Sequence, residues 1–143
     1  MSFRRFRTVA RGFTLVELLV VLAILGLLAG LVGPAVLNQL GGAKSKTALV
    51  QIKDIEQALE LYKLDVGRFP STQEGLDALV RKPAGANGWN GPYLKKGEVP
   101  KDPWGNAYQY ANPGKQGGVD VISLGADNQP GGEGENADIG VQN

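Results

Sequence analysis

The chain opens with an abrupt change from basic to apolar positions. Residues 18–37 contain no charged side chain over twenty positions. A helix of that length is about 30 Å long, which matches the thickness of the hydrocarbon core of a bilayer. A helix on the surface of a soluble domain keeps a charged face, and this segment has none. The pattern therefore predicts a membrane-inserted helix over residues 13–37.

The spacing of apolar residues changes after the Gly41-Gly42 pair. Apolar side chains then recur every three or four positions, at Leu49, Ile52, Ile55, Leu59 and Tyr62. This is the spacing of one face of an amphipathic helix, and charged residues fill most of the other positions. We therefore expect one long helix that lies in the membrane in its first half and packs against a soluble domain in its second half.

Short elements follow the point where Gly67 and Pro70 end this helix. Ser71 and Glu74 are spaced as a capping box, which predicts a short helix to about residue 81 with Leu76, Leu79 and Val80 facing inward. Trp89 and Tyr93 are expected to anchor the next loop by packing.

The last third of the chain reads as short strands between turns. We expect them near residues 92–95, 107–110 and 119–124, with Val119, Val121 and Ser123 on one side of the last. Three antiparallel strands packed on the amphipathic helix would bury its apolar face. The predicted fold class is therefore α+β, a long N-terminal helix with a small C-terminal antiparallel sheet.

Charge and composition narrow the function. The four arginines before the apolar run, with no acidic residue among them, predict a cytoplasmic N-terminus and an exported C-terminal domain. The net charge of +1 gives no reason to expect a nucleic acid partner. The absence of histidine removes a Ser-His-Asp triad and argues against a zinc site. Since the chain has no cysteine, packing or a bound metal has to hold the exported domain.

Two residues of the apolar region have more than one interpretation. Glu17 is an acid at the edge of a membrane helix, where a charge costs about 2.5 kcal/mol or more. It is either hydrated at the interface or paired with a positive group when subunits pack. Pro34 is expected to kink or locally melt the helix. This break is either tolerated, as in many membrane helices, or lets the segment bend or extend in a filament.

The segment Gly12-Phe13-Thr14-Leu15-Val16-Glu17 resembles the type III signal of type IV pilins and type II secretion pseudopilins. The resemblance implies that a prepilin peptidase cuts between Gly12 and Phe13, which removes a leader of residues 1–12, and that Phe13 becomes N-methylated. It also implies that Glu17 neutralises the N-terminal amine of a neighbouring subunit. A buried carboxylate and a buried ammonium cost less together than each alone.

Later segments narrow the resemblance to the major pseudopilins of type II secretion. They are residues 62–65, 68–76, 102–105 and 123–127, in the same order as in that family. The resemblance implies a transmembrane or filament-core helix at 13–37 and a periplasmic pseudopilin domain at 38–143. It further implies a non-enzymatic subunit of a helical pseudopilus that drives export of folded proteins across the outer membrane. The expected partners are inner-membrane lipid, copies of the chain, minor pseudopilins, the peptidase and the inner-membrane secretion platform.

The glycine-rich stretch at residues 125–138 carries four carboxylates. Composition alone is typical of a flexible acidic tail, but such a loop also suits Ca²⁺, which binds six to eight carboxylate and carbonyl oxygens. The spacing does not match an EF-hand. In the major pseudopilins the corresponding loop binds one structural calcium. The ligands that this resemblance implies are Asp127 and Asp138 through their side chains and Leu124, Gln129 and Glu135 through carbonyls.

Two other functions remain as alternatives. A type IV pilin or DNA-uptake pilin would share the N-terminal signal, but the near-neutral charge and the lack of the usual C-terminal disulfide argue against it. A membrane-anchored periplasmic enzyme would use the acidic loop for acid–base chemistry. Those acids lie in a glycine-rich loop without a visible nucleophile, so we expect no enzymatic activity.

Overall fold

A computed structural model describes residues 11–140 of the chain. Helix α1, Leu15–Val66, contains 52 residues, and the chain divides into two compact units, residues 1–38 and 39–143. Within the described residues, α1 is the one helix long and apolar enough to cross a membrane, and its most apolar stretch has a mean hydropathy of 2.8 with no buried residue. The long helix predicted from the sequence is confirmed.

The helix is continuous through the positions where the sequence predicts an interruption. Pro34 and the Gly41-Gly42 pair all lie inside α1. A proline inside a helix removes one backbone hydrogen bond and strains the preceding turn, but α1 continues for many residues on both sides of Pro34. Of the two outcomes predicted at Pro34, local melting is therefore wrong for the single chain, and a kink stays a prediction.

The second half of α1 supplies the centre of the hydrophobic core. Its buried side chains after Gly41 are Ala48, Ile52, Ile55, Ala58, Leu59 and Tyr62. Leu49 is 43% exposed, so its predicted place in the core is wrong, and Ala48 occupies that position. The reason is geometric: apart from Ala58, the buried residues follow a spacing of four, three, four and three, and Ala48 continues this row one turn before Ile52.

Residues that follow α1 cover this buried face. Leu76, Leu79, Tyr108 and Val121 join the same cluster. The rings of Trp89 and Tyr62 both contact Tyr93 edge-on, at centroid distances of 5.7 and 5.9 Å. The Trp89 indole also donates a hydrogen bond to the Ala78 carbonyl, 2.8 Å away. Packing of Trp89 and Tyr93, as predicted, therefore holds the 80–93 loop against the core.

The short helix predicted after Pro70 is reduced to turns followed by the 3₁₀ helix η1, Leu76–Leu79. Gly75, at the N-cap position, has a φ of 62°, which breaks the helical path that would join residues 72–75 to η1. Leu76 and Leu79 face the core as expected, whereas Val80 is half-buried.

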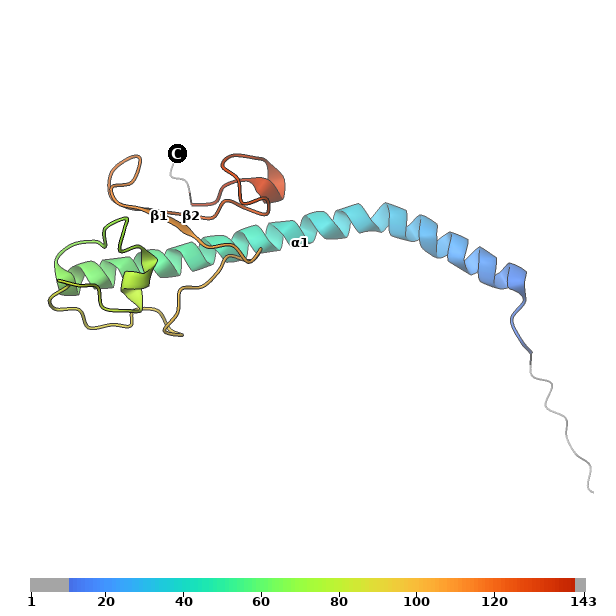
Figure 1. Ribbon diagram of the computed structural model, residues 1–143. Coiled ribbons are helices and arrows are strands. Elements are labelled where there is room, and N and C mark those ends of the chain that lie inside the picture. The colour runs from blue at the N-terminus through green and yellow to red at the C-terminus, as the bar shows by residue number, and fades with distance from the viewer. Residues whose placement is uncertain (1–10, 141–143) are drawn as a thin grey trace, which may run out of the picture. The chain divides into compact units, whose positions relative to one another are not determined.

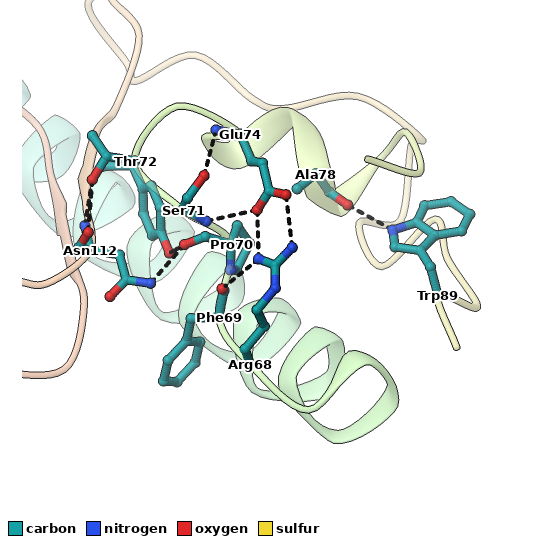
Figure 2. Close-up of polar contacts among 10 residues, drawn as sticks. Arg68, Phe69, Pro70, Ser71, Thr72, Glu74, Ala78, Trp89 and Asn112 are labelled. Carbon is teal, nitrogen blue, oxygen red and sulfur yellow. Dashed lines mark hydrogen bonds and ion pairs between the residues drawn. The ribbon is translucent and has the colours of Figure 1, made fainter. Parts of the chain in front are cut away.

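The predicted capping box is present and forms part of a larger polar cluster (Figure 2). The Ser71 N–H donates to Glu74 Oε2 at 2.8 Å, and the Glu74 N–H donates to Ser71 Oγ at 3.1 Å. The guanidinium of Arg68 binds both oxygens of Glu74, at 2.7 and 2.9 Å. The Arg68 bond and the Ser71 N–H lower the pKa of Glu74 to about 2.

The sheet contains two short strands rather than three. Strands β1, Gln109–Ala111, and β2, Asp120–Ile122, pair antiparallel with Tyr110 opposite Val121. Figure 1 shows them beside the second half of α1. Isolated bridges join Lys101 to Ala107 and Ser123 to Ile139. No strand forms at residues 92–95, because this segment has no neighbouring strand to pair with in the described chain.

The Arg68–Glu74 pair makes the stability of the domain depend on pH. Because the folded-state pKa of Glu74 lies below its usual value of 4.5, its contribution is complete above that value and is lost as the pH falls towards 2. We expect the Glu74→Gln variant to be less stable than the wild type at pH 7 by about 1 kcal/mol, since the pair is partly exposed. The difference should shrink between about pH 5 and 2.

Urea unfolding of the full chain in detergent micelles at several pH values measures this difference. The exposed α1 residue Glu60, which forms no ion pair in the described chain, provides the matched Glu60→Gln control. A gap between the wild type and Glu74→Gln that stays constant from pH 7 to pH 2 would contradict the pairing.

Candidate functional site

The N-terminal motif lies at the beginning of α1. Gly12 and Phe13 precede the helix, and the Phe13 side chain is 89% exposed. Both residues are exposed and lie outside any helix or strand. Residues 1–10 of the predicted leader lie outside the described residues.

Glu17 has a local partner, Thr14, that was not predicted from the sequence. The Glu17 N–H donates to Thr14 Oγ1 at 3.2 Å, and the Thr14 N–H donates to Glu17 Oε2 at 3.5 Å. These reciprocal bonds form a capping box at the start of α1. The signal was present, because a threonine followed three positions later by glutamate precedes an apolar run. In the single chain, Glu17 therefore caps its own helix.

The C-terminal loop is closed by contacts between its two ends. The bridge between Ser123 and Ile139 places Leu124 opposite Asp138. The Ala126 N–H donates to the Glu135 carbonyl at 2.8 Å. Two predicted ligands, Leu124 and Asp138, thus lie on facing segments, and the Glu135 carbonyl belongs to the contact that closes the loop.

Gly125 allows this close approach. Its φ is 69°, and an added Cβ would lie 2.7 Å from the Glu135 carbonyl oxygen and 2.9 Å from that of Ala137. Only a glycine lets the backbone pass so near to two carbonyl oxygens in this conformation.

The acidic side chains of the loop differ in what they contact. Asp127 Oδ1 accepts a hydrogen bond from the Gln129 N–H at 3.1 Å, and both residues are exposed. Asp138 Oδ2 accepts from the Gly131 N–H at 3.0 Å. The Glu135 side chain lies against Gly41 of α1, where an added Cβ would meet it. Asp127 and Gln129 are therefore hydrogen-bonded to each other and not to Asp138.

One oxygen in this region is buried without a partner. Asp138 Oδ1 accepts no hydrogen bond from any residue in the described part of the chain. A buried carboxylate oxygen left in this way is costly unless a cation or a donor meets it. Carboxylate and carbonyl oxygens are also the ligands that Ca²⁺ prefers. Within residues 11–140, no three acidic side chains gather into a cluster, so a cation here would depend on backbone carbonyls as well.

The architecture defines a class of protein. A long N-terminal helix with an apolar first half, a second half packed on a small antiparallel sheet, and a Gly-Phe-Thr-Leu-Val-Glu start are the features of a pilin-like subunit. Two family models agree: the prokaryotic N-terminal methylation motif matches residues 7–33, and type II secretion system protein G matches residues 35–142. The chain belongs to the type II secretion system protein G family.

Similar proteins carry the same description. The type II secretion system core protein G of Pseudomonas aeruginosa is 53% identical over 133 residues, which cover 90% of this chain and 92% of that protein. Its counterpart from Vibrio cholerae is 50% identical over 135 residues, which cover 92% of this chain and 91% of that protein. These similarities favour a type II secretion subunit over a surface or DNA-uptake pilin.

The fold is also similar to that of a solved structure. The crystal structure of the major pseudopilin from the type 2 secretion system of enterohaemorrhagic Escherichia coli has a TM-score of 0.57 and 35% identity. The match covers 68% of this chain and 85% of that one. With its apolar N-terminal helix, the chain is a membrane-anchored component of the secretion system.

Gly140 limits how the C-terminal loop packs on α1 and β2. Its φ is 94°, and an added Cβ would lie 2.3 Å from the Val121 carbonyl oxygen and 2.9 Å from Ile52 Cδ1. Because a backbone oxygen in a strand cannot move aside easily, we expect Gly140→Ala to lower the free energy of unfolding by about 3 kcal/mol or more. Chemical unfolding of the full chain in micelles measures this loss.

Gly67→Ala is the matched control, because Gly67 has a φ of 88° and no atom within 4 Å of an added Cβ. It isolates the cost of a positive φ, about 1–2 kcal/mol. Equal losses for the two variants would mean that residue 140 is not confined by Val121 and Ile52.

Proposed function

We propose that this chain is the major structural subunit of a periplasmic pseudopilus that drives export of folded proteins across the outer membrane. The observation that carries this proposal is the protein G family match over residues 35–142 directly after a methylation motif at 7–33. Minor pseudopilins, the inner-membrane secretion platform and the prepilin peptidase are its proposed partners. The proposed topology has a cytoplasmic N-terminus and a periplasmic domain, in agreement with the arginines before α1.

The proposed processing has a physical role in assembly. Cleavage after Gly12 leaves the Phe13 amine at the start of an apolar helix, two residues before α1 begins. In a bundle of such helices this ammonium and the Glu17 carboxylate of the next subunit compensate each other. Glu17 then exchanges its own backbone donor at Thr14 for an ammonium, whose full positive charge compensates the carboxylate better than the dipole of a single N–H does.

Variants of Glu17 test the assembly role. We expect Glu17→Ala and Glu17→Gln to insert in the membrane and to be processed, but to form far fewer filaments than the wild type. Intact mass should show loss of residues 1–12 and one methyl group on Phe13 for all three proteins. Glutamine still completes a capping box, so Glu17→Gln separates the charge from the helix cap.

Filament yield, measured by electron microscopy and quantitative blotting of filaments released by lysing the cells, gives the readout. Normal filaments from Glu17→Gln would show that the charge is not needed. An unprocessed wild-type chain would overturn the pseudopilin proposal itself.

We further propose a structural Ca²⁺ in the C-terminal loop, with the side chains of Asp127 and Asp138 and the carbonyls of Leu124, Gln129 and Glu135 as ligands. The unpartnered Asp138 Oδ1 supports it, since this oxygen needs a positive or donating group. Leu124 lies opposite Asp138, and the Glu135 carbonyl accepts the Ala126 N–H, so these proposed ligands come from the two ends of the loop where they meet. Asp127 and Gln129 are exposed and hydrogen-bonded to each other, so they would have to turn towards the cation when it binds. The cation would hold the loop closed.

Asp138→Asn tests this proposal, because the stability difference between the variant and the wild type should change sign when calcium is added. Without calcium, the variant should be at least as stable as the wild type, because it removes a poorly compensated charge. With calcium at 100 times its Kd, the wild type should gain about 2.7 kcal/mol and the variant much less. Thermal unfolding in chelator and in excess Ca²⁺ measures both, and Glu133→Gln, an exposed acid of the same loop, is the control. A wild type indifferent to Ca²⁺ would refute the site.

A further inference from the structure

A buried polar relay connects the turn at residues 102–106 with the start of the C-terminal loop. Asp102 is 4% exposed and Ser123 is fully buried. The Ser123 hydroxyl donates to Asp102 Oδ2 at 2.7 Å, and its oxygen accepts the Gly125 N–H at 3.2 Å. Because the hydroxyl hydrogen is directed at Asp102, the lone pairs of Ser123 Oγ are left for the Gly125 N–H.

The carboxylate at the other end of the relay is held at both oxygens. Asp102 Oδ1 accepts hydrogen bonds from the N–H groups of Trp104, at 3.1 Å, and Asn106, at 2.8 Å. The backbone N–H of Asp102 donates to the Asn106 carbonyl at 2.8 Å, and that of Gly105 donates to the Asp102 carbonyl at 2.9 Å. A side chain bound in this way has little freedom to rotate, so it fixes the direction of the Ser123 hydroxyl.

The relay acts on one peptide unit of the loop. The N–H of Gly125 and the carbonyl of Leu124 belong to the same planar peptide, which is trans. In a trans peptide these two groups point in opposite directions, so a fixed N–H also fixes the carbonyl. Ser123 therefore directs the Leu124 carbonyl away from itself. Leu124 lies opposite Asp138, whose Oδ1 is buried and unpartnered.

We infer that Asp102 and Ser123 are positioning residues for cation binding, which orient the Leu124 carbonyl without themselves contacting the ion. The inference rests on the calcium site proposed above. A ligand that already points in the binding direction loses less conformational freedom when the ion arrives. The Asp102-Pro103-Trp104-Gly105 turn then has a role in the C-terminal loop, about twenty residues further along the chain.

Calcium affinity separates positioning from simple stabilisation. The experiment titrates calcium chloride into the chelator-stripped full chain in detergent micelles and follows the heat of binding. We expect Ser123→Ala to raise the Kd for Ca²⁺ about tenfold, equivalent to about 1.4 kcal/mol. Asp102→Asn should raise it about threefold, because it keeps an acceptor for Trp104 and Asn106 but no longer accepts the Ser123 hydroxyl hydrogen at Oδ2.

Thr72→Val is the matched control for lost hydrogen bonds. The Thr72 hydroxyl also donates once and accepts once, to the carbonyl and from the N–H of Asn112, at 3.0 and 2.9 Å (Figure 2). This control should lower the melting temperature measured in chelator and leave the Kd for Ca²⁺ at the wild-type value.

The outcomes distinguish this inference from the calcium proposal. A wild-type Kd in both Ser123→Ala and Asp102→Asn, with lowered melting temperatures, would restrict the relay to stability and overturn the inference alone. A wild type that takes up no Ca²⁺ would overturn the calcium site and this inference together. If Ser123→Ala does not fold, the Kd of Asp102→Asn decides.

Discussion

The fold depends on burial of the apolar face of α1, which is covered mostly by loops and only in part by strands. Ile52, Ile55, Leu59 and Tyr62 are almost inaccessible to solvent, yet the strands that cover them have three residues each. So small a sheet provides few backbone hydrogen bonds, and a two-stranded sheet alone is marginally stable. The apolar face of α1 therefore organises segments whose own backbone pairing is too limited to keep them in place.

Polar side chains supply much of the backbone pairing that regular structure would otherwise provide. Asp102 binds the N–H groups of its own turn, Thr72 binds both backbone groups of Asn112, and the Asn112 amide donates to the Pro70 carbonyl at 2.8 Å. Each of these contacts pairs a backbone group that lies outside the helices and strands, and the Asp102 contacts do so in a part-buried turn where an unpaired group would be costly. This explains how a domain with little secondary structure can still have a defined core.

The features that could be predicted from the sequence are those with a local physical signal. The apolar run and the helical repeat from Ile52 to Tyr62 gave the extent of α1, and the Ser71–Glu74 spacing gave the capping box. Predictions failed where the answer depended on partners distant in the chain. A strand at residues 92–95 lacked a neighbour to pair with, and Leu49 competed with Ala48 for the same place in the core. The Glu17 cap was not predicted although its signal is local. Because an apolar run follows it, Glu17 was interpreted only as a charge at the edge of a membrane helix.

The candidate cation site also combines features with a local sequence signal and features that depend on distant parts of the chain. Composition identified the loop, and family resemblance supplied the residues, but neither indicated that Asp138 Oδ1 would be buried without a partner. Nor did they indicate the route from Asp102 through Ser123 to Gly125, which joins segments about twenty residues apart. This series of hydrogen bonds depends on which distant segments the core brings together, and a local sequence pattern does not indicate that.

The two ends of the packed half of α1 are held by different chemistry. At its C-terminal end, the Arg68–Glu74 pair and the bond from the Tyr93 hydroxyl to Asp65, at 2.7 Å, are complete within the chain. At the other end, the C-terminal loop rests on the helix through Glu135 at Gly41 and Gly140 at Ile52. These loop contacts persist only while a glycine-rich segment stays ordered, which is entropically costly. The contacts at the Gly41 end of the packed half of α1 therefore depend on order in the loop, whereas those named at its C-terminal end involve no residue of the loop.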